Sequence, residues 1–193
     1  MKLVVMKFGG SSVAGADKVK HVAGRIIQKK KEGYRVVVVV SAPGDMTDDL
    51  IAMAEGITKS PPPREMDMLL ATGDQASIAL LCMALHARGH AAISLTGPQA
   101  GIYADADHTR ARITKILPKK VLSELAKRRI VVVAGFQGLN PHEDIATLGR
   151  GGSDLTAIAM AAALKADLCE IYTDVEGVYT TDPRGGLRRP EAG

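Results

Sequence analysis

A glycine-rich segment with one basic and one acidic side chain, residues 148–154, has the composition of an anion-binding loop. It precedes an alanine-rich run with apolar residues at helical spacing, which predicts a loop that leads into a helix. Backbone N–H groups at a helix N-terminus attract anions, and glycines let a ligand approach them closely. The guanidinium of Arg150 suits a carboxylate or a phosphate, and Asp154 adds a carboxylate beside it. The alternative is an ordinary helix start that Ser153 or Asp154 caps.

Three further polar or glycine-rich loops each follow a run of apolar residues. They cover residues 7–12, 41–47 and 135–138. Lys7 is a point charge suited to transferring phosphate oxygens, unless it is only an exposed lysine at a strand end, and its place before the glycines excludes the P-loop pattern. Ser41 and Thr47 can contact a ligand, although Thr47 can equally cap the next helix. Because open α/β sheets bind ligands at the carboxyl ends of their strands, the four loops together predict one composite anion site.

Expected strands and helices alternate along the chain, which predicts an α/β fold with a mostly parallel sheet. The expected strands cover residues 3–6, 36–40, 91–95, 130–134 and 168–172. The expected helices include residues 19–27, 121–127 and 155–164. Between residues 65 and 88 we expect two helices with a kink or loop at residues 71–74. Asp74 either caps the second helix, which the sequence favours, or presents a carboxylate to the site.

The polar stretch of residues 104–115 is compatible with a hairpin or an edge structure. It contains three side chains of metal-ligating type, which are Asp105, Asp107 and His108. We favour a solvated turn over a metal site for this stretch. Residues 140–145 predict another turn.

The 193 residues are sufficient for one well-buried domain, and 46% hydrophobic and 24% charged residues are ordinary for a globular protein. The net charge is +4, but aromatic residues make up only 3%, which argues against a nucleic-acid surface that stacks bases. Cys82 and Cys169 lie in apolar segments without metal or redox spacing, so we interpret them as reduced core residues. With no signal segment and no long apolar run, we expect a cytoplasmic protein that contacts neither membrane nor nucleic acid.

Six segments resemble, in order and spacing from Lys7 to about Arg184, the motifs of the aspartate kinases within the amino acid kinase family. They are residues 7–13 (KFGGSSV), 40–42 (VSA), 66–73 (MDMLLATG), 134–138 (AGFQG), 147–154 (TLGRGGSD) and 169–184 (CEIYTDVEGVYTTDPR). The resemblance implies a three-layer α/β/α sandwich with a mainly parallel sheet, incomplete at its C-terminal end. It implies a truncated kinase domain at residues 1–184, with a flexible tail at 185–193. The family also implies a homodimer or an assembly with a further kinase chain.

The activity implied is phosphoryl transfer from ATP with Mg²⁺ to the side-chain carboxylate of L-aspartate, which gives 4-phospho-L-aspartate on the way to lysine, threonine and methionine. Lys7 would stabilise the transferring group and Asp154 would organise the donors around it. The substrate would be bound by Ser41, Thr47, Asp74, Arg150 and Ser153, with Asp74 standing where the family has a glutamate. The nucleotide would be held by Lys7, Gly9, Gly10, Ser11, Thr173, Asp174, Tyr179, Asp182 and Arg184. Mg²⁺ would be held mainly by the phosphates, without a protein metal site.

The alternative function is that of a catalytically impaired relative that works as a ligand-binding, structural or regulatory subunit. Retention of Lys7, Arg150 and Asp154 favours descent from an active enzyme.

Overall fold

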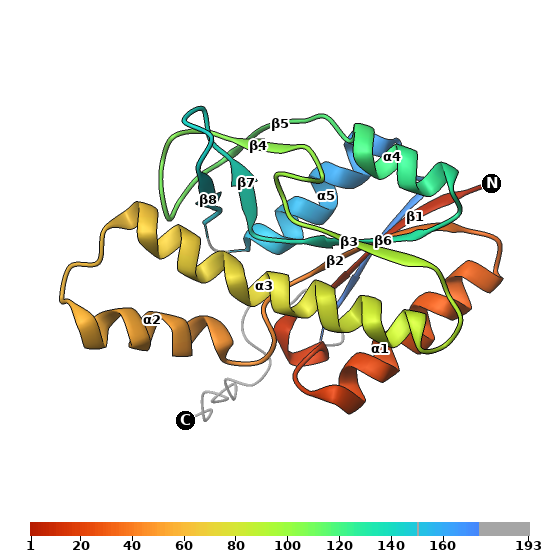
Figure 1. Cartoon of the computed structure of the whole chain (residues 1–193). Coiled ribbons are helices and arrows are strands. Elements are labelled where there is room, and N and C mark those ends of the chain that lie inside the picture. Colours follow the sequence, from red (N-terminus) through yellow and green to blue (C-terminus); the bar gives the residue numbers. More distant parts are fainter. Residues whose placement is uncertain (150, 174–193) are drawn as a thin grey trace, which may run out of the picture.

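A computed structural model of the chain describes residues 1–149 and 151–173. Its centre is a five-stranded parallel sheet in the order β3-β6-β2-β1-β9. The strands are β1 (Leu3–Phe8), β2 (Arg35–Val40), β3 (Ala92–Leu95), β6 (Ile130–Ala134) and β9 (Leu168–Tyr172). Helices α1 (Ala16–Lys31) and α3 (Pro63–His86) cover one face, and α4 (Lys119–Ala126) and α5 (Gly152–Leu164) cover the other (Figure 1). The predicted three-layer sandwich with a mainly parallel sheet is therefore confirmed.

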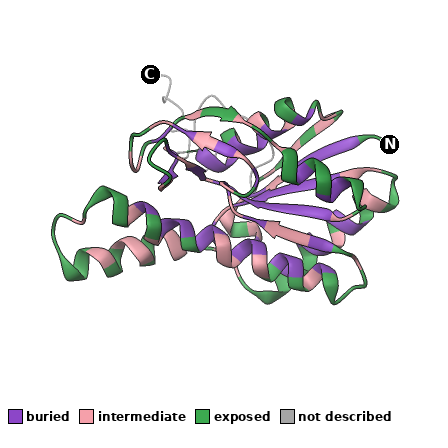
Figure 2. Cartoon of the chain, turned by 45° about the horizontal axis from the view of Figure 1, so that its top comes forward, coloured by how far each residue is buried: buried purple, intermediate pink, exposed green. Residues whose placement is uncertain are grey.

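The central strands are buried on both faces, as their continuous runs of β-branched residues predict (Figure 2). On β1, Met6 and Phe8 pack into the core beneath α1 and α3, whereas Val5 packs into the core beneath α4 and α5. Successive side chains of a strand point to opposite faces, so Lys7 shares the face of Val5. This alternation directs the lysine towards α5.

One continuous helix, α3, replaces the two helices expected between residues 65 and 88. The expected break at residues 71–74 is wrong, and Asp74 lies in the helix interior instead of capping a second helix. Gly73 is explained by packing, because a Cβ at this position would lie 2.8 Å from the Cβ of Ala42. A glycine inside a helix here provides close approach to a neighbouring loop and does not end the helix.

By length and composition α3 is the one described helix that could cross a membrane, with a mean hydropathy of 1.6 over its best window. Half of that window is buried inside the fold, and the helix carries the buried carboxyl groups of Asp67 and Asp74. We therefore interpret α3 as a core helix. Helix α2 (Met46–Ile57) packs along its N-terminal half and forms with it an arm that extends beyond the sheet (Figure 1).

A second, four-stranded sheet in the order β5-β4-β7-β8 covers the α5 side of the molecule. Strands β4 (Ile102–Ala104) and β5 (Ile113–Ile116) pair antiparallel, which confirms the hairpin expected in this stretch. Strands β7 (Gln137–Leu139) and β8 (Ile145–Thr147) were not predicted, since three residues are too few to show alternation. The turn between them is as expected, with the Asn140 side-chain oxygen accepting hydrogen bonds from two backbone N–H groups.

The two cysteines differ in environment, and both are free thiols. Cys82 is buried in α3 as expected, and burial raises the pKa of its thiol to about 12. Cys169 is exposed, so its assignment to the core is wrong. It lies on β9, whose position at the edge of the sheet leaves it only partly covered. The predicted domain at residues 1–184 and tail at 185–193 stay predictions, because residues 174–193 are not among those described.

Candidate functional site

A cleft of about 270 Å³ opens where β1, β2 and β6 end and α5 begins. All four loops that the sequence singled out contribute to its wall, from Lys7 near the start of the chain to Asp154. The lining residues are Lys7, Gly10, Ser41, Ala42, Gly44, Thr47, Asp74, Phe136, Gly151, Gly152, Ser153 and Asp154. The cleft therefore lies at the carboxyl ends of parallel strands, where open α/β sheets bind ligands.

Lys7 and Asp154 form an ion pair across the cleft, with 2.7 Å between Nζ and Oδ1. The Lys7 side chain is 13% exposed, so the alternative of a lysine exposed at a strand end is wrong. The alternation along β1 directs Lys7 towards α5, and Asp154 lies in the first turn of that helix. The carboxylate fixes the ammonium group at the mouth of the cleft, where it can meet a ligand anion.

The N-terminus of α5 forms one wall of the cleft. Its N-cap is Gly151, with a φ of 77°, and within residues 1–149 and 151–173 no side chain bonds the first turn as a cap. The alternative in which Ser153 or Asp154 caps the helix is therefore wrong. Ser153 is buried and lines the cleft, and Asp154 forms an ion pair with Lys7. The uncapped helix end retains its partial positive charge for an anion.

The opposite wall comes from the loops after β1 and β2, which are joined by a hydrogen bond of 3.0 Å from Gly44 N to Gly10 O. Ser41 and Thr47 both line the cleft from this side. Helix α2 begins at Met46 with Asp45 at its N-cap, so Thr47 lies within the first turn and is not the cap. Thr47 lines the cleft, where its hydroxyl group can contact a ligand.

Asp74 lines the cleft from α3 and is only 2% exposed. Burial raises the pKa of its carboxyl group well above the ordinary value, while hydrogen bonds to the backbone N–H groups of Ala42 and Asp74 partly oppose the shift. Because burial disfavours the ionised form of Asp74, a cationic group bound beside it would favour that form.

The residues expected to hold a nucleotide are only partly described. Gly10 lines the cleft at the start of a short 3-10 turn, Gly10–Ser12, and Gly9 lies close to Lys7, since a Cβ there would be 3.5 Å from Nζ. Ser11 is exposed, and Thr173 directly follows β9. Five expected site residues lie outside the described residues: Arg150, Asp174, Tyr179, Asp182 and Arg184.

Phe136 lines the cleft and had no expected role, although it lies in one of the four loops. Its φ of 63° is one that residues other than glycine adopt rarely. Its backbone N–H donates to the Thr156 hydroxyl at 3.3 Å, which ties the loop to α5. A strained backbone angle leaves no signal in a single sequence.

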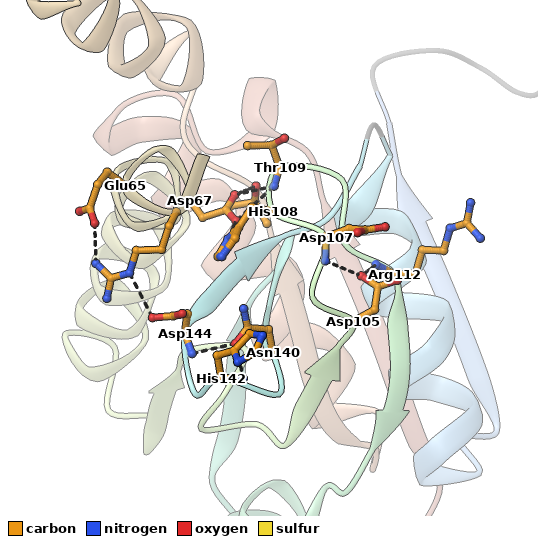
Figure 3. A network of polar contacts seen from close by, with 12 residues as sticks. Glu65, Asp67, Asp105, Asp107, His108, Thr109, Arg112, Asn140, His142 and Asp144 are labelled. Carbon is orange, nitrogen blue, oxygen red and sulfur yellow. Dashed lines mark hydrogen bonds and ion pairs between the residues drawn. The ribbon is translucent and has the colours of Figure 1, made fainter. Parts of the chain in front are cut away.

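The possible metal ligands of the β4–β5 loop serve structure. Asp105 accepts hydrogen bonds from the backbone N–H groups of Asp107 and Arg112, and His108 contacts Asp67 instead of its neighbours (Figure 3). Within residues 1–149 and 151–173, no group of three or more His, Cys, Asp and Glu side chains could hold a metal ion. The solvated turn that the sequence favoured agrees with these contacts.

The cleft thus combines a lysine, a helix N-terminus and hydroxyl groups with two carboxylates. Its positive groups suit phosphate or carboxylate oxygens, whereas the buried carboxyl group of Asp74 suits an ammonium group. This combination fits a zwitterion together with a transferable phosphate.

Comparison with known proteins agrees with this chemistry. Residues 2–187 match the amino acid kinase family. Aspartokinase 2 of Bacillus subtilis is 56% identical over 184 residues, which cover 95% of this chain and 45% of that protein. Aspartate kinase from Synechocystis has a TM-score of 0.80 at 49% identity, over 94% of this chain and 30% of that one. Aspartokinase III of E. coli, in complex with aspartate and ADP, has a TM-score of 0.84 at 27% identity, over 95% of this chain and 52% of that one. The chain spans about 45% of the length of its curated relative from B. subtilis.

Proposed function

Because the chain belongs to the amino acid kinase family, we propose that its cleft binds L-aspartate and ATP and transfers a phosphoryl group to the side-chain carboxylate of the amino acid. The observation that carries the proposal is the placement of the Lys7–Asp154 pair and the buried Asp74 in one cleft. The relatives named as aspartate kinases and the E. coli complex with aspartate and ADP support the choice of substrates.

Lys7 acts on the transferring group. A carboxylate oxygen of aspartate bonds to the terminal phosphorus as the bond from that phosphorus to the bridging oxygen breaks, and ADP leaves with the electron pair. Negative charge spreads over the phosphoryl oxygens during this step, and a positioned ammonium group stabilises it. Asp154 holds Lys7 in position through the 2.7 Å ion pair.

Asp74 binds the ammonium group of aspartate. Its carboxyl group is only 2% exposed and lacks most of its hydration, so a bound ammonium group would stabilise the ionised form. Ser41, Thr47 and Ser153 surround the same space, and their hydroxyl groups can donate to carboxylate oxygens. Arg150, which lies outside the described residues, is proposed to bind the α-carboxylate.

ATP fits the arrangement because the N-terminus of α5 and the loop around Gly10 present backbone donors to the cleft from opposite walls. Mg²⁺, which lowers the charge of the phosphates when bound, is proposed to be held mainly by the phosphates themselves. The proposed nucleotide contacts are Lys7, Gly9, Gly10, Ser11, Thr173, Asp174, Tyr179, Asp182 and Arg184.

The finer parts of the proposal follow from the resemblance to the family. They are that the reaction is the first step toward lysine, threonine and methionine, that the protein is cytoplasmic, and that it forms a homodimer or assembles with a further kinase chain. The chain would act without nucleic acid or membrane.

The test is aspartate-dependent acyl phosphate formation, trapped with hydroxylamine as the hydroxamate and measured beside L-aspartate binding by calorimetry. We expect product with L-aspartate and MgATP, and none without the amino acid. Lys7→Ala should lose product and retain aspartate binding. Lys20→Ala, which removes an exposed lysine of α1, is the matched control and should retain both.

Absence of both binding and product in the folded wild-type chain would refute the proposal. Binding of L-aspartate without product would instead support the alternative function, a ligand-binding or regulatory subunit.

A further inference from the structure

Asp67 is a completely buried carboxyl group that lies outside the cleft. It belongs to α3 and joins two segments that are far from it in the chain. Its oxygens accept hydrogen bonds from the Thr109 backbone N–H at 3.0 and 3.1 Å and from the Thr147 hydroxyl, and one lies 2.5 Å from His108 Nδ1 (Figure 3). Burying a carboxyl group is costly unless it is fully paired, so this side chain stabilises one particular arrangement of its partners.

The face of α3 that carries Asp67 also carries Asp74. Residues 67, 71 and 74 are spaced by four and three positions and therefore share one side of the helix. The carbonyl of Ala71, between them, accepts a hydrogen bond of 3.1 Å from Gln137, a completely buried side chain of β7. One face of α3 thus forms hydrogen bonds with β8 through Asp67 and with β7 through Ala71. The same face lines the cleft with Asp74.

Thr147 is connected to the cleft by tight packing. The next residue, Leu148, donates its backbone N–H to Phe136 O at 2.8 Å, and Phe136 lines the cleft. A Cβ on Gly152 would lie 2.7 Å from the Cβ of Leu148 and 2.8 Å from a ring carbon of Phe136. Gly152 is the first residue of α5, so this contact leaves no free space between the end of β8 and the start of the helix.

From these contacts we infer that Asp67 is a positioning residue for the cleft. It fixes Thr147, and through Leu148 and Gly152 it fixes the first turn of α5. That turn carries Asp154, whose carboxylate places Lys7. The catalytic consequence rests on the proposed function, whereas the mechanical coupling of Asp67 to α5 does not.

The consequence of losing this support follows from the demands of phosphoryl transfer. The reaction depends on positioning, and a displacement of about 1 Å by a distant substitution can lower the rate about 10²-fold. A displaced Asp154 alters the position of Lys7, which acts on the transferring group. We therefore expect a larger effect on kcat than on the KM for aspartate, because Asp154 in the first turn of α5 places Lys7, whereas the proposed substrate contacts Asp74 and Ser41 lie outside α5.

The experiment uses the whole chain and the variants Thr147→Val, Thr147→Ser and Asp67→Asn. Valine has nearly the shape of threonine but cannot donate to Asp67, whereas serine retains the hydroxyl group. Glu124→Gln is the control, because it perturbs another buried carboxyl group, 1% exposed, that pairs with Lys120, Lys127 and Arg129 on α4 and its flank, away from the cleft. Backbone amide exchange of residues 147–155 is followed by mass spectrometry, and kcat and KM by the hydroxamate assay.

We expect faster exchange in residues 147–155 and a kcat lowered roughly 10- to 100-fold in Thr147→Val and Asp67→Asn. Thr147→Ser should restore both towards the wild type, and Glu124→Gln should change neither by more than its general loss of stability. Exchange in the two variants that matches Glu124→Gln would overturn the inference. If the wild type forms no product, the proposed function fails, and the exchange data still decide whether Asp67 fixes the start of α5.

Discussion

Replacing Asp74 by asparagine should stabilise the ligand-free protein at neutral pH and weaken its binding of L-aspartate. Asparagine has nearly the same shape but carries no charge at any pH. The wild-type carboxyl group is 2% exposed and is ionised only against the cost of losing its water. This burial lowers the stability of the ligand-free protein at neutral pH, and in the proposed function the same carboxyl group meets the ammonium group of the substrate.

The pH dependence has a definite sign. Burial raises the pKa of Asp74 in the folded state, so the folded protein binds this proton more tightly than the unfolded chain does. The favourable contribution is complete below the ordinary pKa and is lost as the pH rises through the raised value. The variant should therefore have nearly the wild-type Tm at pH 4 and a higher Tm at pH 8. Each 1 kcal/mol of this difference corresponds to roughly 2–4 °C for a chain of this size.

The binding effect can be estimated from the contact that is lost. A hydrogen bond to a charged group contributes about 1.5–3 kcal/mol, and 1.4 kcal/mol corresponds to a tenfold change in Kd. We expect the Kd for L-aspartate to rise about 10- to 100-fold in Asp74→Asn, measured by calorimetry at pH 8. Asp48→Asn removes an equal charge from the exposed first turn of α2, next to Thr47, and should change neither Kd nor Tm appreciably.

Two results would refute this reasoning separately. A lower Tm for Asp74→Asn than for the wild type at pH 8 would show that the carboxylate is already well paired in the empty cleft. An unchanged Kd, with the expected gain of stability, would show that Asp74 does not bind the ammonium group.

Three further predictions test the site and the fold. Lys7→Ala should lower kcat for hydroxamate formation roughly 10²- to 10³-fold and change the calorimetric Kd for L-aspartate little, because the lysine acts on the transferring phosphoryl group. Gly73→Ala should lower the free energy of unfolding in urea by about 1–3 kcal/mol through overpacking, whereas Gly56→Ala, with open space around it, should raise it by roughly 0.5–1 kcal/mol. The pKa of Tyr172 is raised to about 12 by burial and by its hydrogen bond to Glu170. Its contribution to stability should fall between pH 10 and 12, and Glu170→Gln should lower the pKa measured by NMR titration.

The sequence alone was sufficient to predict the central sheet and the loops that form the cleft. Strands buried on both faces are continuous runs such as residues 36–40, and that signal is local. Glycine and polar loops at the ends of such runs are local as well, and parallel pairing brings them together. For this reason the sequence alone assigns Lys7 and Ser41 to one site, and both residues line the cleft.

The interior of α3 could not be predicted in this way. Gly73 and Asp74 have the local character of a helix break followed by a cap, and only the loop at Ala42 explains both. The short strands β7 and β8 were missed for a similar reason, since their formation depends on neighbours far along the chain. Asp67 and Thr147, which are 80 residues apart, bond through tertiary structure alone.

Prediction from the local sequence fails at the positions where α3 contacts the cleft and where it contacts the neighbouring strand β8. Fully buried carboxyl groups such as those at residues 67 and 74 are rare in a core helix unless they are paired, and both accept hydrogen bonds from segments that reach α3 only in the folded chain. Within the described part of the chain, Asp67 is paired with side chains and backbone of distant segments, whereas the hydrogen bonds of Asp74 come from backbone N–H groups and its proposed partner is the ammonium group of the substrate. The difference in pairing between two carboxyl groups two turns apart on one helix therefore distinguishes a positioning role from a binding role, and the Asp67→Asn and Asp74→Asn variants should have opposite effects on stability at pH 8.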